Sequence, residues 1–203
     1  MAGFLILPRN KFMINDVLEQ IVEDYFRGNG YFTQHNVKYR QNDKGVHSDI
    51  DVLGIHPYKK GAEKVVVISC KSWQGGLNIK SDLDALKNNP EKVVSGKLIK
   101  NMWKEFFDKN YANALQDKVC ELTGGKEFIF YLAVTKYKGN KEDWENFPLF
   151  IRNYPNCKIK IIDLKTMIDE IWKFLTTTPS HSELTRLLQL IKADDGRIQY
   201  ENN

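Results

Sequence analysis

The sequence predicts an α/β domain in which a mixed β-sheet is flanked by helices. Apolar runs of strand length alternate with longer stretches of helical periodicity, in the order helix, three strands, helix, strand, helix, strand and two helices. Helices that fall between strands cover both faces of a sheet. With 203 residues, 42% of them hydrophobic, the chain is long enough to bury a full core as a single domain.

The first helix is expected to begin at Asn15, a suitable N-cap, and to end near Arg27, before a Gly-Asn-Gly turn. Its apolar stripe leaves Glu19 at the border, from which the carboxylate can lean towards a site. Glu23 falls nearly opposite the stripe, so we expect it to be solvated. The short apolar run within residues 1–12 is expected to form an N-terminal arm or strand.

The remaining elements follow from local pattern and from glycine and proline breaks. Residues 81–121 are expected to form two helices, interrupted near the Asn-Asn-Pro sequence that ends at Pro90. Residues 196–203 are expected to be a loose tail. Strands are expected at 31–40, 48–56, 63–71, 127–135 and 157–164, and further helices at 143–152, 165–175 and 182–192.

Asp51 and Lys71 are the most informative pair, because they close the two arms of the expected hairpin at 48–71. Strand alternation puts Asp51 on one face of the first arm and Ser69 with Lys71 on one face of the second. An acid and a lysine can therefore meet. A carboxylate and an ammonium group together can hold a divalent cation and stabilise charge on a phosphate, as metal-assisted phosphodiester hydrolysis requires. The alternative is a cross-strand ion pair, worth about 0.2–1 kcal/mol.

Composition limits the partners and the compartment. A net charge of +4 makes the chain mildly basic, which permits contact with a polyanion without requiring it. The three cysteines match neither a zinc site nor a disulfide framework, so we expect a reducing cytoplasm. No segment approaches membrane-spanning length, and a membrane partner is not expected.

The pattern resembles the PD-(D/E)xK nuclease superfamily, particularly its Mrr-type and Holliday-junction-resolvase-type members. The resemblance rests on Glu19 in the first helix, Gly30-Tyr31 after it, and Asp51 followed by Ser69-Cys70-Lys71 in the hairpin. It spans about residues 15–135. It implies a restriction-endonuclease-like core in α-β-β-β-α-β order, with residues 136–195 as an α/β and helical extension of the same domain.

Carried onto this chain, the resemblance makes Asp51 the principal ligand of Mg²⁺ and Glu19 a second ligand, direct or through water, with Mn²⁺ as a substitute metal. Cys70 would contribute its backbone carbonyl. Lys71 would orient or help deprotonate the attacking water and offset charge in the transition state.

The chain departs from the family at Ser69, which stands where relatives carry the acid of the acid-x-Lys pattern. Asp49, Asp82 and Asp84 are the candidates for a substitute carboxylate, and the sequence does not choose among them. The departure also leaves open a degenerate nuclease fold that binds DNA or serves in assembly without cutting.

The function expected from the resemblance is a Mg²⁺-dependent endodeoxyribonuclease in restriction, defence or repair, acting as a homodimer if it makes double-strand breaks. An RNA nuclease is a weaker alternative. Trp73 and Gln74 are placed to contact a nucleotide, although Trp73 equally suits core packing. A phosphate track or a solvated helix face would explain four lysines, Lys80, Lys97, Lys100 and Lys104.

Overall fold

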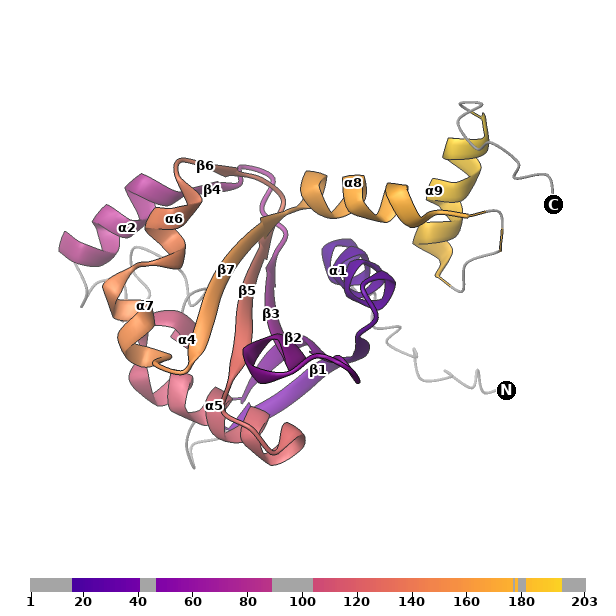
Figure 1. The fold of residues 1–203 in the computed structure, drawn as a ribbon. Coiled ribbons are helices and arrows are strands. Elements are labelled where there is room, and N and C mark those ends of the chain that lie inside the picture. Colours follow the sequence, from indigo (N-terminus) through magenta and orange to yellow (C-terminus); the bar gives the residue numbers. More distant parts are fainter. Residues whose placement is uncertain (1–15, 41–46, 89–103, 177, 179–181, 195–203) are drawn as a thin grey trace, which may run out of the picture.

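The computed structural model describes residues 16–40, 47–88, 104–176, 178 and 182–194. Its centre is a five-stranded sheet in the order β1-β2-β3-β5-β7, with helices on both faces (Figure 1). This arrangement confirms the predicted α/β class with a mixed sheet. The expectations for the N-terminal arm, Asn15, Lys97, Lys100 and the tail lie outside the described residues.

The sheet combines an antiparallel meander with two parallel strands. In the meander, β1 (Phe32–Arg40), β2 (His47–Ile55) and β3 (Val65–Lys71) pair in sequence order. The strands β5 (Phe128–Val134) and β7 (Cys157–Asp163) run parallel to β3. Parallel strands end at the same edge of a sheet, so the carboxyl ends of β3, β5 and β7 lie together.

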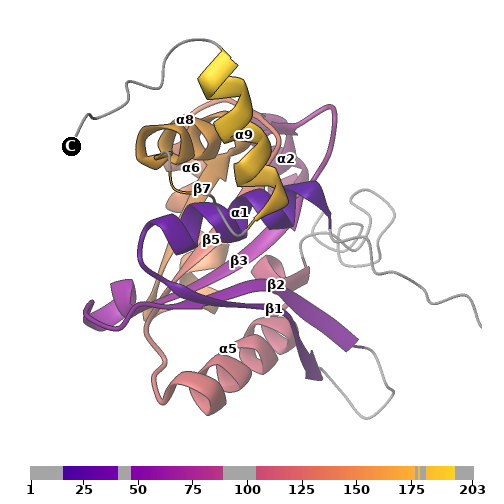
Figure 2. The ribbon, with the colours of Figure 1, turned by 90° about the vertical axis from the view of Figure 1, so that its right-hand side faces the viewer.

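One face of the sheet is covered by α1 (Val17–Gly28) and α8 (Leu164–Phe174). The N-cap of α1 is Asp16, whose side chain accepts the Leu18 N–H at 2.8 Å. The buried stripe of α1 packs against Val52, Val66 and Ile68 of the sheet. A further helix, α9 (Glu183–Asp194), lies beyond α1 and α8, farther from the sheet (Figures 1 and 2).

The other face carries five described helices and the larger core. They are α2 (Ile79–Asn88), α4 (Lys104–Phe107), α5 (Lys109–Thr123), α6 (Lys141–Glu145) and α7 (Pro148–Asn153). The single helix predicted over 143–152 was wrong. Pro148 stands at the first position of α7, where its missing N–H and fixed φ start a new helix rather than continue α6.

Three short elements were not predicted. The 3₁₀ helix η1 (Gly61–Lys64) joins β2 to β3. The two-residue strands β4 (Leu77–Asn78) and β6 (Tyr137–Lys138) pair in parallel beyond the carboxyl ends of β3 and β5. Among the helices in the described ranges, none has the length and apolar character needed to cross a membrane.

Candidate functional site

Asp51 lies beside the last residues of β3, as the hairpin pattern predicted. Its Oδ2 atom accepts the backbone N–H of Cys70 at 2.5 Å. The register, with Val52 opposite Ile68, brings Asp51 level with Ser69 on the same face of the sheet. The carboxylate is half-buried.

Lys71 ends β3 and points into a charged environment. Its Nζ atom is 3.5 Å from Oε1 of Glu105, and the two side chains are only 19% and 14% exposed. Burial acts to lower the pKa of Lys71, but the charges of Glu105 and Asp51 outweigh burial and raise it, so the ammonium is protonated at neutral pH. Within the described part of the chain, Lys71 pairs with Glu105 rather than with Asp51, so the simple cross-strand ion pair is not formed.

Glu105 places a carboxylate beside Ser69, the position at which the acid-x-Lys pattern would have an acid. The hydroxyl of buried Ser69 donates a hydrogen bond to its Oε1 atom at 2.7 Å. The three acids expected for this role are engaged or located differently: Asp82 accepts the Asn78 N–H at 3.1 Å at the start of α2, and Asp49 and Asp84 are exposed. Sequence reasoning missed Glu105.

The position of Glu105 is set by the aromatic core beneath α4. Tyr154 donates its hydroxyl hydrogen to the Glu105 carbonyl, and Asn153 donates its side-chain N–H to the Phe106 carbonyl at 2.9 Å. Phe106 is fully buried and stacks on Phe130 of β5, with ring centroids 4.3 Å apart. The acid before the Phe-Phe pair was a visible signal of a fixed carboxylate, but it did not reveal which strand the carboxylate would face.

The charge of Asp51 acts on Glu19, and the charge of Glu105 acts on Asp51. Burial, and then the charges of Asp51 and Asp16, raise the pKa of Glu19. Burial also raises the pKa of Asp51, with Glu105 adding to the rise and Lys71 and the Cys70 N–H opposing it. Such mutual repulsion in a partly buried place is relieved by a bound cation.

The donor chemistry of this site suits a hard cation such as Mg²⁺, which prefers oxygen ligands. The described residues, however, contain no three His, Cys, Asp or Glu side chains already grouped to hold a metal ion. Burial, followed by the charges of Asp51 and Glu19, holds the pKa of the Cys70 thiol well above its ordinary value, so the sulfur stays neutral. The metal-ligand role of the Cys70 carbonyl stays a prediction.

The residues expected to contact nucleic acid differ in exposure. Trp73 is half-buried and packs against the larger core, and its carbonyl accepts a hydrogen bond from the Thr135 hydroxyl. Core packing therefore describes much of its role. Gln74 and Lys80 are exposed, whereas Lys104 lies over the Tyr111 ring at 5.3 Å.

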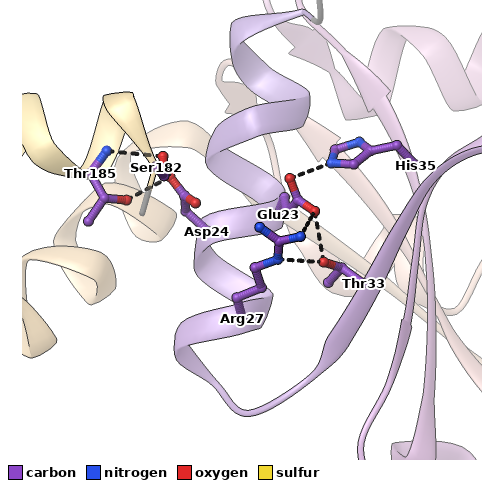
Figure 3. Close-up of polar contacts among 7 residues, drawn as sticks. All are labelled: Glu23, Asp24, Arg27, Thr33, His35, Ser182 and Thr185. Carbon is purple, nitrogen blue, oxygen red and sulfur yellow. Dashed lines mark hydrogen bonds and ion pairs between the residues drawn. The ribbon is translucent and has the colours of Figure 1, made fainter. Parts of the chain in front are cut away.

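Glu23 is not solvated, so that prediction was wrong (Figure 3). Its side chain is 14% exposed, and its carboxylate lies 2.5 Å from His35 Nε2 and 2.7 Å from Arg27 Nη2 and accepts the Thr33 hydroxyl at 2.8 Å. Burial alone would raise the pKa of Glu23, but the hydrogen bonds from His35 and Thr33 and the charges of His35 and Arg27 lower it. The reason is that β1 runs beside α1 and covers a second side of the helix. Glu23 thus ties α1 to β1 one turn after Glu19.

Asp24 ties α9 to α1 in the same way. Its Oδ2 atom accepts hydrogen bonds from the Ser182 hydroxyl at 2.5 Å and the Thr185 hydroxyl at 2.6 Å (Figure 3). Glu23 and Asp24 of α1 therefore hold neighbouring elements in place. Glu19 is the acid of this helix whose pKa is affected by the charge of Asp51.

Comparison with protein-family models, with curated proteins and with solved structures gave no match for this chain.

Proposed function

We propose that the protein is a metal-dependent endodeoxyribonuclease of the PD-(D/E)xK type, with a restriction-endonuclease-like fold, acting on DNA in restriction, defence or repair. The observation that carries the proposal is the meeting of Glu105 with Ser69 and Lys71 at the end of β3. It supplies from α4 the acid that the Ser69-Cys70-Lys71 sequence lacks. The resemblance of the sequence to this superfamily supports the same reading.

Three carboxylates would hold the metal: Asp51, Glu19 and Glu105. Mg²⁺ is the expected ion, with Mn²⁺ as a substitute, and the Cys70 carbonyl is a further oxygen ligand. When bound, the cation supplies Lewis acidity towards a phosphoryl oxygen and lowers the pKa of a bound water.

Lys71 contributes a positive charge to this chemistry. Against the effect of burial, the charges of Glu105 and Asp51 raise the pKa of Lys71, which favours its ammonium form. It can donate a hydrogen bond to a phosphoryl oxygen and stabilise the charge that develops there as water adds and the P–O bond breaks. Ser69 and the Cys70 N–H are positioning groups, since they hold the oxygens of Glu105 and Asp51.

Cleavage of supercoiled plasmid DNA with Mg²⁺ or Mn²⁺ tests the proposal. We expect nicked or linear product from the wild type and a loss of at least about 100-fold for Asp51→Asn and Lys71→Met. The exposed acid Asp84, changed to Asn, is the matched control and should leave cleavage intact. Wild-type rates retained in both site variants would refute the assignment of roles. Linear product without a nicked intermediate, and a solution mass of two chains, would support a homodimer.

A second candidate function is a DNA-binding or assembly module that does not cut. It is favoured by one observation, that Glu105 and Asp51 are both engaged by protein groups and that the described residues form no ready-made metal group. It predicts binding that weakens with salt and no product with any divalent metal. Cleavage that depends on Lys71 would exclude it, and parallel RNA substrates would separate a DNA nuclease from an RNA nuclease.

A further inference from the structure

The strands β4 and β6 form a separate two-stranded sheet beyond the carboxyl ends of β3 and β5 (Figure 1). Leu77 donates its N–H to the Lys136 carbonyl at 2.9 Å, and the Thr135 hydroxyl donates to the Trp73 carbonyl. At Gly76, where φ is +73°, an added Cβ would lie 2.4 Å from Lys136 Cγ and 2.6 Å from its carbonyl oxygen. Only glycine allows this approach, so the backbone of Lys136 is held firmly against the turn that follows β3.

Lys136 directly precedes β6, and Lys138 is its last residue. Tyr137 between them packs against the larger core, whereas both lysines are exposed. Successive side chains of a strand alternate, and residues two apart are separated by about 6.6 Å along the strand. This spacing is comparable with that of neighbouring phosphates in an extended nucleic-acid strand.

The two lysines lie beyond the bend at Thr135, which follows the strand paired with β3 at Lys71. Lys71 is in register with Val134, so Lys136 follows two residues and Lys138 four residues beyond the level of Lys71. The two exposed lysines therefore lie on the segment that follows the strand paired with β3 at Lys71.

The charges of Lys136 and Lys138 are available to a ligand. Neither forms an ion pair with any residue that the structure describes, whereas Lys165 and Lys173 of α8 each lie 2.5 Å from a carboxylate. Lys80 is less suitable, because it shares the pocket between α2 and α6 with the acids Asp84, Glu142 and Asp143.

We propose that Lys136 and Lys138 form a phosphate-binding ledge, which holds two neighbouring phosphates of the nucleic-acid strand whose scissile bond lies at Lys71. This inference rests on the proposed nuclease function and adds the path that the strand takes away from the site.

The test measures binding of a fluorescently labelled DNA duplex by anisotropy in EDTA, over a series of salt concentrations. The variant Lys136→Gln/Lys138→Gln keeps the side-chain stems and removes both charges. The control Lys126→Gln/Lys158→Gln changes net charge equally, with two exposed lysines near the opposite ends of β5 and β7. Thermal unfolding verifies that both variants are folded.

We expect the slope of log Kd against log salt to fall by about 1.8 for the ledge variant, about 0.9 for each lost phosphate contact, and to stay at the wild-type value for the control. Equal slopes for the ledge variant and the wild type, or an equal loss in the control, would overturn the ledge. Absence of both binding and cleavage in the wild type would overturn the nuclease proposal and the ledge together. Wild-type cleavage with an unaffected ledge variant would overturn the ledge alone.

Discussion

Replacing Glu105 by glutamine separates its charge from its role as a hydrogen-bond acceptor. The side-chain carbonyl of the new glutamine would still accept the Ser69 hydroxyl, which now lies 2.7 Å from the Glu105 oxygen. The negative charge beside Lys71, and next to Asp51, would be gone. If Glu105 completes a metal site, cleavage should depend on this charge far more than folding does.

The expected loss of stability for Glu105→Gln is small. The ion pair with Lys71 is long, at 3.5 Å, and the charge of Asp51 still acts on Lys71 after the change, so its removal costs about 1 kcal/mol. The weaker hydrogen bond from Ser69 adds about 1 kcal/mol, and relief of the repulsion with Asp51 offsets part of both. A net loss of about 1 kcal/mol lowers the Tm of a chain of this length by about 2–4 °C.

Glu105→Ala should be clearly worse for folding. It also leaves the hydroxyl of Ser69, which is 7% exposed, without this acceptor, and an unsatisfied buried hydroxyl costs about 1–3 kcal/mol. We therefore expect a total loss of about 3 kcal/mol and a fall in Tm of about 6–12 °C. The difference between the two variants measures the hydrogen-bond acceptor together with the packing of the side-chain stem.

Plasmid cleavage over a Mg²⁺ series, with differential scanning calorimetry on the same samples, tests the reasoning. Both variants should lose cleavage by about 100-fold or more at limiting Mg²⁺. The control is Glu121→Gln on α5. The Glu121 side chain is 64% exposed and pairs with Lys118 at 2.8 Å, so this change should affect neither the cleavage rate nor the Tm. Cleavage within about threefold of the wild type by Glu105→Gln, at unchanged Mg²⁺ dependence, would refute the role of Glu105.

Three further predictions concern stability. The folded state raises the pKa of Asp51 above its ordinary 3.8, so the ionised carboxylate weakens the fold at neutral pH. Asp51→Asn should therefore raise Tm at pH 7 and lose this gain as pH falls towards 3.8, and a lower Tm at pH 7 would contradict the prediction. The folded state lowers the pKa of Glu23 below 4.5, so ionised Glu23 stabilises the fold above pH 4.5, and this contribution is lost as pH falls through the folded-state pKa. In urea unfolding measured over a pH series, Glu23→Gln should reduce the loss of stability at acid pH. An unchanged loss would exclude the contact between Glu23 and His35 as its source. Phe106→Ala, at a fully buried position, should lower the free energy of unfolding in urea by about 3–5 kcal/mol, and a loss below about 1 kcal/mol would mean that α4 is not held by its aromatic core.

The elements that sequence analysis predicted well are those with strong local periodicity. The hairpin of β2 and β3 follows from alternation, and α1 follows from its apolar stripe, which needs no knowledge of the partner. The division of residues 143–152 into two helices could have been read from Pro148, whereas β4 and β6 are too short to give any period.

The parts of the site that were missed depend on long-range packing. Glu105 reaches Ser69 across 36 residues of sequence, and its direction is set by Phe106, Asn153 and Tyr154, none of which carries a site motif. Glu23 was misjudged because helical periodicity describes one buried face, while Thr33 and His35 of the edge strand β1 also contact Glu23. Asp51 and Lys71 were placed from the sequence because both belong to neighbouring strands of one hairpin.

The anchoring of α4 has a consequence for the newly synthesised chain. Asp51 and Lys71 leave the ribosome long before Asn153 and Tyr154, which fix α4 through the carbonyls of Phe106 and Glu105. If Glu105 is required for the proposed cleavage, a nascent, truncated or proteolysed chain that lacks α7 and Tyr154 would have the hairpin but would be inactive. Under the proposed function, cleavage would therefore begin only after the helices on this face of the sheet have packed.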